Sequence, residues 1–119
     1  MPHRDWKFRI QDILDAVSAV QEYTRGMEFK TFTEDRKTVD AVVRNLIVIG
    51  EAAVHVPEDI CRKHPQVPWY EMRGMRNFVV HEYFRASDAV IWDTVHVDLP
   101  PLPALIKKIL EENSDEQAE

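Results

Sequence analysis

The chain has 119 residues, 45% of them hydrophobic and 30% charged, and its 21 acidic against 15 basic residues give a formal net charge of −6. This length and composition predict one globular domain over residues 1–119, with no apolar run long enough to cross a membrane and no signal peptide at the N-terminus. A single cysteine excludes an internal disulfide and fits a cytoplasmic location, while the acidic balance argues against broad, non-specific binding of nucleic acid.

Apolar residues recur at helical spacing in the first half of the chain. The spacing predicts a helix over residues 5–25, which Gly26 ends. After a loop over residues 27–32, Thr33 is suited to cap a second helix that runs to about His55. The apolar residues of this second helix cover more than one side, which indicates a bundle centre or a dimer face. They are Val39, Val42, Val43, Leu46, Ile47 and Ile49.

Prolines divide the second half of the chain. A short helix starts at Pro57 and stops before Pro65, and Pro68 begins a longer helix that runs to about Glu82. Ser87 or the residue after it opens the next helix. Four of its residues are expected to pack inward: Val90, Ile91, Val95 and Leu99. Three prolines then break or kink it: Pro100, Pro101 and Pro103.

A final helix follows these prolines, and from Glu111 the acidic tail is expected to fray. The chain has only three glycines and few alternating apolar positions, which argues against a sheet. The pattern therefore predicts an all-α protein, an up-and-down helical bundle of four to six helices.

The helix after Pro68 carries a dense polar motif. Arg76, Asn77, His81 and Tyr83 form the pattern Arg-Asn-x-x-x-His-x-Tyr. They lie in a basic segment, residues 62–85, where five Lys or Arg against two acids give +3. Asn77 and His81 are four apart and share a helix face, but Arg76 and His81 diverge by about 140°. Either the helix ends or loosens near His81, or a second copy supplies a matching set across a two-fold axis.

These residue types suit metal-free cleavage of RNA. His81 titrates near neutral pH and can exchange a proton, Arg76 can hold a phosphate, and Asn77 can orient the imidazole. Two copies of the +3 segment would form a narrow basic cleft in a dimer whose total charge is −12, twice −6. The alternative is that Arg, Asn and His cap carbonyls at a helix C-terminus, and that Tyr83 is a packing residue.

Two further residues are candidates for a supporting role, Glu51 and Arg73. Glu51 lies within the apolar second helix and needs a partner there. We expect it to pair with an arginine of the motif helix, although a surface pair with His55 at i,i+4 fits equally well. Read as metal ligands, Glu51 and His55 lack a third member, so neither a metal nor a cofactor is expected.

The motif and several other segments resemble HepT-like proteins of the HEPN superfamily. The resemblance covers about residues 5–110. It rests on Asp12-Ile13-Leu14, Phe32-Thr33-Glu34-Asp35, Ala41 to Leu46, Ile49-Gly50-Glu51-Ala52, Pro68-Trp69, Gly74 to Asn77, His81-x-Tyr83-Phe84, Val90-Ile91-Trp92 and Asp98-Leu99-Pro100. One departure is Arg85-Ala86-Ser87, where the family usually has a small Gly-Val-Asp turn.

The resemblance implies a dimeric helical bundle with a ribonuclease site formed by Arg76 and His81 of both subunits. It also implies a toxin–antitoxin pair in which a minimal nucleotidyltransferase, the antitoxin, attaches AMP to Tyr83 and silences the toxin. The leading hypothesis is thus an endoribonuclease toxin acting on RNA, tRNA included. The alternatives are a non-catalytic substrate of the nucleotidyltransferase and a helical dimer whose motif is only a polar interface.

Overall fold

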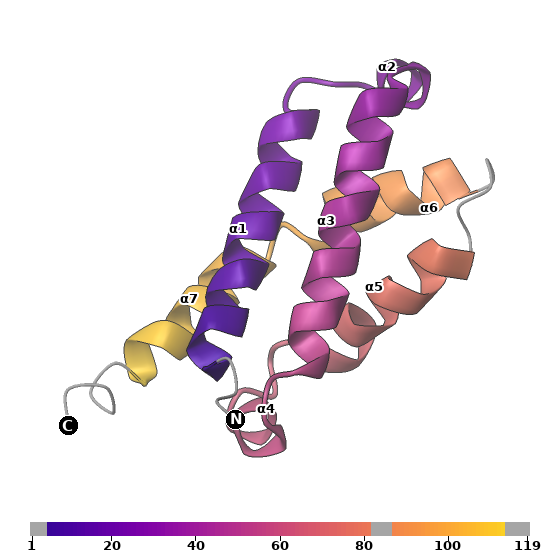
Figure 1. Cartoon of the computed structure of the whole chain (residues 1–119). Coiled ribbons are helices and arrows are strands. Elements are labelled where there is room, and N and C mark those ends of the chain that lie inside the picture. Colours follow the sequence, from indigo (N-terminus) through magenta and orange to yellow (C-terminus); the bar gives the residue numbers. More distant parts are fainter. Residues whose placement is uncertain (1–4, 82–86, 114–119) are drawn as a thin grey trace.

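The structure is a computed structural model that describes residues 5–81 and 87–113, with the backbone alone described for residues 77–81 and 87. Across this part of the chain it has seven α-helices, one π-helical turn and no strand (Figure 1). The predicted all-α bundle is confirmed. The additional helix is α2 (Phe29–Glu34), which lies where the sequence predicted a loop.

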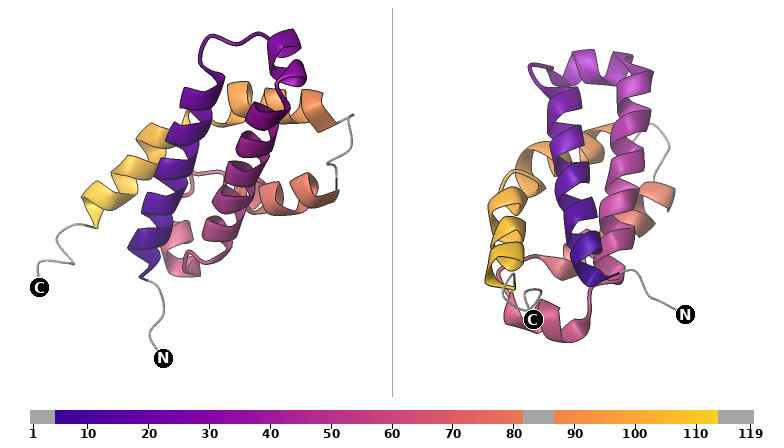
Figure 2. Two further views of the ribbon diagram at one scale, coloured as in Figure 1. Left: turned by 45° about the horizontal axis from the view of Figure 1, so that its top comes forward. Right: turned by 60° about the vertical axis from the view of Figure 1, so that its left-hand side comes forward.

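The two longest helices, α1 (Trp6–Thr24) and α3 (Arg36–Val54), lie side by side in all views (Figures 1 and 2). The carboxylate of Asp5 caps α1 by accepting a hydrogen bond from the backbone N–H of Lys7 at 2.9 Å. Gly26 follows α1 with a φ of 77°, a conformation that glycine adopts without strain. The predicted end of the first helix is therefore confirmed.

The predicted N-cap of the second long helix is wrong. Asp35 caps α3, since its carboxylate accepts hydrogen bonds from the backbone N–H of Thr38 at 3.2 Å and from its hydroxyl at 2.8 Å. Thr33 lies inside α2 and donates to the carbonyl of Lys30 at 2.9 Å. The reason is aromatic packing, because the buried ring of Phe32 lies 5.1 Å from that of Trp92 and holds α2 against a later segment.

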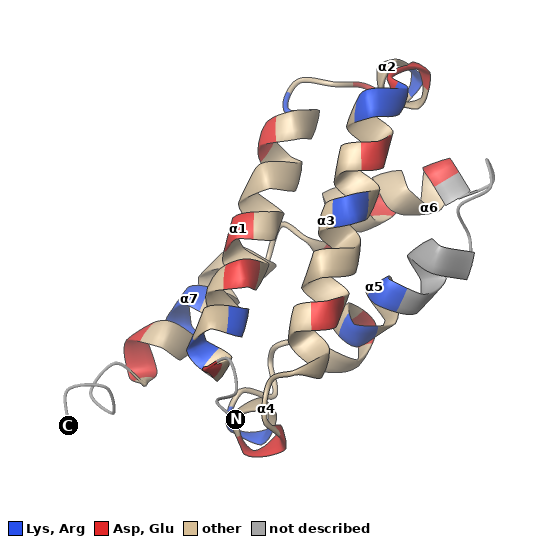
Figure 3. Cartoon of the chain, viewed as in Figure 1, with Lys and Arg blue, Asp and Glu red and all other residues tan. Residues whose placement is uncertain are grey.

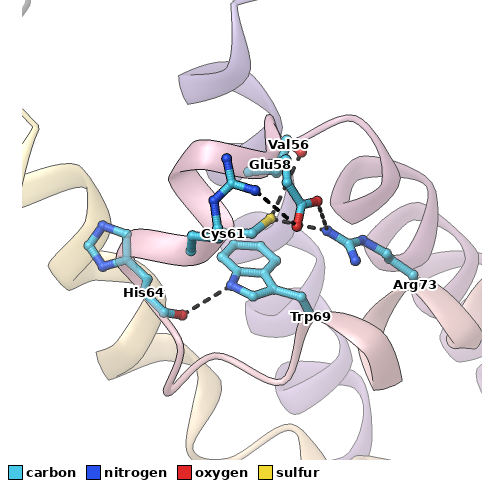
Figure 4. Close-up of polar contacts among 7 residues, drawn as sticks. Val56, Glu58, Cys61, His64, Trp69 and Arg73 are labelled. Atoms are coloured by element: carbon cyan, nitrogen blue, oxygen red, sulfur yellow. Dashed lines mark hydrogen bonds and ion pairs between the residues drawn. The ribbon is translucent and has the colours of Figure 1, made fainter.

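The short helix α4 (Glu58–Lys63) and the motif helix α5 (Trp69–His81) follow the predicted boundaries closely. Trp69 is buried at the start of α5, and its indole N–H donates to the carbonyl of His64 at 3.0 Å (Figure 4). This hydrogen bond stabilises the connection between α4 and α5.

The C-terminal part contains α6 (Ser87–Asp93), a π-helical turn η1 (Thr94–Asp98) and α7 (Leu102–Glu112). Arg36 donates to the carboxylate of Asp88 at 2.8 Å and so connects α3 with the first turn of α6. The hydroxyl of Thr94 donates to the carbonyl of Val90 at 2.9 Å, a side-chain bond of the kind that distorts helices. It lies where α6 widens into η1.

Three predictions for this part need correction. Val90 is 46% exposed, whereas Ile91, Val95 and Leu99 are buried at i, i+4 and i+8, the face that meets the core. Pro103 lies in the first turn of α7, where no backbone donor is lost, so it does not break a helix. The helix continues through Glu112, and the side chain of the following asparagine donates to the carbonyl of Ile109 at 2.7 Å.

The core is formed around α3. This helix packs against α1 on one side and α5 on the other, while α7 packs against α1. Val39, Val42, Leu46 and Ile49 of α3 are buried, whereas Val43 and Ile47 are half-buried. Of the two predicted roles of this helix, a bundle centre or a dimer face, its burial between α1 and α5 supports the first. In the described part of the chain, no helix is long and apolar enough to span a membrane.

Candidate active site

The helices α3 and α5 lie in close contact where Gly50 faces Arg76. A Cβ atom added to Gly50 would lie 2.5 Å from the backbone nitrogen of Arg76 and 2.9 Å from its Cβ. Ordinary van der Waals contacts of a Cβ are 3.4–4 Å, and backbone atoms cannot move aside as a flexible side chain can. Glycine is therefore required for this crossing, and the crossing places the backbone of Arg76 against the centre of the bundle.

The residue after this glycine holds the side chain of Arg76. Arg76 Nη1 donates to Glu51 Oε1 at 2.8 Å, a charge-assisted hydrogen bond between α5 and α3. The two side chains are 40% and 45% exposed, so the guanidinium is oriented by Glu51 and still accessible to a ligand. The predicted pair between Glu51 and an arginine of the motif helix is confirmed.

Glu51 is also close to two other cationic or titratable side chains. The second predicted partner, His55, has its Nδ1 at 3.8 Å from Glu51 Oε2 and 2.9 Å from the Glu51 carbonyl oxygen. The hydrogen bond from Arg76 lowers the pKa of Glu51, and the charges of Arg76, His55 and Arg9 add to this against the opposing effect of burial. Glu51 is thus a carboxylate at neutral pH. The sequence offered no sign of Arg9, whose charge acts on Glu51 because α1 packs on α3.

The remaining motif residues lie at and beyond the end of α5. Asn77 and His81 belong to the last turns of α5, where the structure describes the backbone, and Tyr83 lies outside the described residues. The backbone is helical from Arg76 to His81, so the two positions differ by about 140° around the axis of α5. One copy of α5 therefore does not bring these two positions to the same face.

Arg73 lies one turn before Arg76 but contacts a different helix. Its Nη2 donates to the Cys61 sulfur at 3.1 Å and lies 4.0 Å from Glu58 Oε1, both on α4 (Figure 4). Burial raises the pKa of the Cys61 thiol and outweighs the opposing charge of Arg73, so the sulfur is a neutral, weak acceptor. The structure therefore separates the two predicted supporting residues, since Glu51 contacts Arg76 and Arg73 does not.

Basic residues lie along α5, and the other helices carry both basic and acidic residues (Figure 3). The described part of α5 contains Arg73 and Arg76 against Glu71 alone. No group of three or more His, Cys, Asp or Glu side chains gathers into a possible metal site within the described residues. The local positive charge comes from arginine, whose planar guanidinium matches phosphate geometry.

An all-α bundle with an oriented, accessible arginine, followed on the same helix by Asn77 and His81, is the arrangement expected of a helical ribonuclease. The comparisons with known proteins agree with this class. The chain belongs to the family described as Ribonuclease HepT-like, whose model matches residues 13–109.

Relatives from archaea and bacteria match nearly the whole chain. A Thermococcus cleftensis protein named "Probable ribonuclease HepT" is 40% identical over 107 residues, which cover 90% of this chain and 94% of the relative. A Methanocaldococcus jannaschii protein named "Putative RNase" is 40% identical over 119 residues, or 100% of this chain and 96% of the relative. A third, also named a "Putative RNase", from Caldanaerobacter subterraneus, is 36% identical over 102 residues, 86% of this chain and 91% of the relative. No solved structure was found to match the chain.

Proposed function

We propose that the protein is a metal-independent endoribonuclease that works as a homodimer, with Arg76, Asn77 and His81 of both subunits lining one cleft. The observation that carries this proposal is the way Arg76 is held. Gly50 lets its backbone approach α3, and Glu51 orients its guanidinium while leaving it accessible. Such an oriented cation suits the scissile phosphate of RNA. Membership of the HepT-like family and the names of the relatives support the ribonuclease role.

Helix geometry is the reason for proposing a dimer. Because Arg76 and His81 diverge by about 140° on one α5, a phosphate held by Arg76 is better placed for a His81 from a second copy. A two-fold axis brings the same patch of both subunits together, so each site receives both residue types. The same axis would join two basic segments of +3 into one narrow cleft on an otherwise acidic protein.

The chemistry needs only proton transfer and charge stabilisation. One His81 accepts the proton of the ribose 2′-OH as the 2′-oxygen attacks the adjacent phosphorus, and the P–O5′ bond breaks. The leaving 5′-oxygen takes a proton from the second, protonated His81, which leaves a 2′,3′-cyclic phosphate and a 5′-hydroxyl. Arg76 stabilises the additional negative charge on the phosphate oxygens, and Asn77 orients the imidazole one turn away.

We further propose that the protein is the toxin of a type VII-like toxin–antitoxin pair, with a minimal nucleotidyltransferase as antitoxin and Tyr83 as the acceptor of AMP. Tyr83 is two residues from His81 in the sequence. A phosphodiester-linked AMP there adds bulk and negative charge where the RNA phosphate has to bind, so modification would block cleavage.

The test is RNA integrity on a gel after incubation of purified protein with total tRNA in EDTA. Intact mass first establishes that Tyr83 carries no AMP. Cleavage by the wild type, and loss of cleavage in His81→Ala and Arg76→Ala, is the expected result. The control is Arg25→Ala, which removes an exposed arginine that pairs with Glu22 at the far end of α1.

If unmodified wild-type protein leaves all RNA intact, the nuclease proposal is wrong, and the non-catalytic alternative becomes the better account. That alternative predicts a mass increase in units of AMP on incubation with the nucleotidyltransferase and ATP, absent from Tyr83→Phe. If His81→Ala or Arg76→Ala instead weakens dimerisation while RNA stays intact for every protein, the motif is a polar interface.

A further inference from the structure

A groove of about 390 Å³ runs between α4 and α5, next to the candidate active site. Its lining includes Arg62 of α4 together with Trp69, Tyr70 and Arg73 of α5. Tyr70 is 82% exposed, whereas Trp69 is buried and held by its hydrogen bond to the carbonyl of His64. The groove thus has a fixed aromatic wall and, beside it, an aromatic ring that faces solvent.

Two arginines of this groove lie near the same carboxylate, each next to a different one of its two oxygens. Arg62 Nη1 lies 3.9 Å from Glu58 Oε2, and Arg73 Nη2 lies 4.0 Å from Glu58 Oε1. Both distances are at the long end for an ion pair, and Glu58 is 66% exposed. Arg73 makes a shorter contact of 3.1 Å to the Cys61 sulfur, a weak acceptor (Figure 4). Both guanidiniums therefore have donors for another oxyanion placed where the Glu58 carboxylate lies.

The groove and the proposed cleavage site lie on neighbouring turns of α5, although Arg76 does not itself line the groove. Tyr70, Arg73 and Arg76 are spaced at i, i+3 and i+6 along α5, so each lies next to the following one on the helix surface. From Tyr70 to Arg76 the rise along the axis is about 9 Å. A strand whose scissile phosphate lies at Arg76 would therefore have a neighbouring nucleotide at the groove.

We propose that this groove binds one nucleotide of single-stranded RNA, with its base stacked on Tyr70 and its phosphate between Arg62 and Arg73 in place of the Glu58 carboxylate. The proposal rests on the proposed ribonuclease function and extends it to a substrate class. Base stacking on an aromatic ring requires an unpaired base, so the groove selects single strands over duplex RNA.

The net charge of the groove lining agrees with the binding of a single nucleotide. Arg62 and Arg73 are balanced by Glu58 and Glu71, so the net charge of the lining is zero. A neutral groove does not attract nucleic acid over long distances, which fits the acidic character of the chain. Binding there depends instead on the local exchange of one carboxylate for one phosphate and on the stacking of one base.

The experiment measures binding of a short fluorescein-labelled single-stranded RNA by fluorescence anisotropy in EDTA. Every protein carries His81→Ala so that the RNA stays intact during the titration. Adding Tyr70→Ala should weaken binding about tenfold, whereas Tyr70→Phe retains the ring and should bind as the parent does. Tyr23→Ala, which removes another exposed tyrosine from α1, is the matched control and should leave the affinity unchanged.

A second variant is expected to act in the opposite direction. Glu58→Gln removes the carboxylate that competes with phosphate and should tighten binding about two- to fivefold, with a smaller effect at high salt. Glu22→Gln controls for net charge, because Glu22 is also 66% exposed and pairs with an arginine, Arg25, at 3.0 Å. A merely structural role of Glu58 would not increase affinity for RNA.

Any one of three results would overturn the groove proposal. Tyr70→Ala could bind RNA as tightly as the parent, Glu58→Gln and Glu22→Gln could change the affinity equally, or duplex RNA could bind as tightly as single-stranded RNA. A parent that binds no RNA would overturn it as well. The gel assay with wild-type protein decides the ribonuclease function separately, because cleavage there stands whatever the groove variants do. Urea unfolding of each variant establishes that the compared proteins are folded.

Discussion

Replacing Gly50 with alanine tests the close crossing on which the candidate site depends. The added Cβ would lie 2.5 Å from the backbone nitrogen of Arg76, against at least 3.4 Å for an ordinary contact, so α3 and α5 must separate by 3.4 − 2.5 = 0.9 Å at this point. Overpacking of this kind costs about 1–3 kcal/mol, and the better helix propensity of alanine returns about 0.5–1 kcal/mol. Taking the middle of each range, we expect Gly50→Ala to lose about 1 kcal/mol of unfolding free energy.

Urea unfolding, followed by circular dichroism at one fixed protein concentration, measures this loss as a lower midpoint with an unchanged slope. The matched control is Gly74→Ala in α5, where an added Cβ meets no atom within 4 Å. Because only the propensity term applies there, we expect Gly74→Ala to gain about 0.5–1 kcal/mol. The two substitutions are chemically identical and should change the unfolding free energy in opposite directions.

The same displacement should affect cleavage, because a shift of about 1 Å in a substrate-binding group can lower a rate on the order of a hundredfold. Gly50→Ala should therefore lose RNA cleavage while remaining folded, and Gly74→Ala should not. If Gly50→Ala is as stable as the wild type, or gains stability as Gly74→Ala does, the close approach of α3 and α5 is refuted.

Three further predictions concern charged and titratable groups. Glu51→Gln should lose at most about 1 kcal/mol of unfolding free energy at pH 7, because its pair with Arg76 is partly exposed. The hydrogen bond from Arg76 lowers the pKa of Glu51 in the folded protein. The stabilisation is therefore fully present above the unfolded-state pKa of about 4.3, and it is lost as the pH falls through the lower folded-state pKa. Urea unfolding at several pH values measures this loss. Asp35→Ala should lower the melting temperature at pH 7 more than Thr33→Ala does, because the Asp35 carboxylate caps α3. The hydrogen bonds from Thr38 lower the pKa of Asp35, so the difference in melting temperature should vanish in acid, where the carboxylate is protonated. The Cys61 thiol should react slowly with a disulfide reagent in the folded protein and rapidly in urea, because burial shields it and raises its pKa.

Each of these predictions has an outcome that contradicts it. A stability difference for Glu51→Gln that is constant from pH 7 to below pH 3 would show that the carboxylate charge is not its source. Equal melting temperatures of Asp35→Ala and Thr33→Ala would mean that Asp35 is not the cap of α3. Equal thiol reaction rates with and without urea would show that Cys61 is not buried in solution.

Local sequence patterns were enough to predict most of the helices. Apolar spacing and the positions of Pro57, Pro65 and Pro68 predicted α1, α3, α4 and α5 to within a few residues, because helix periodicity and proline geometry act within one or two turns. Gly26 marked the end of α1 for the same local reason. The failures arose where a distant segment decides the local structure. Residues 29–34 form a helix because Phe32 packs on Trp92, some sixty residues later.

The candidate site was likewise predictable from the sequence only in part. The sequence by itself determined the all-α class, the resemblance to HepT-like proteins and the motif of Arg76, Asn77, His81 and Tyr83. Which arginine pairs with Glu51 depends on how α5 crosses α3, so only the tertiary structure chose Arg76. His55 lies near Glu51 for a local reason, because the two residues are spaced at i,i+4 at the end of α3, as the sequence predicted.

Only the tertiary structure revealed that Gly50 permits this crossing, that Arg9 approaches from α1, and that Arg73 turns to α4 and forms a groove away from Glu51. The physical reason is that these contacts join helices far apart in the sequence. Periodicity identifies the face that a helix buries, but the atoms that meet across two helices are determined by their distance and crossing angle.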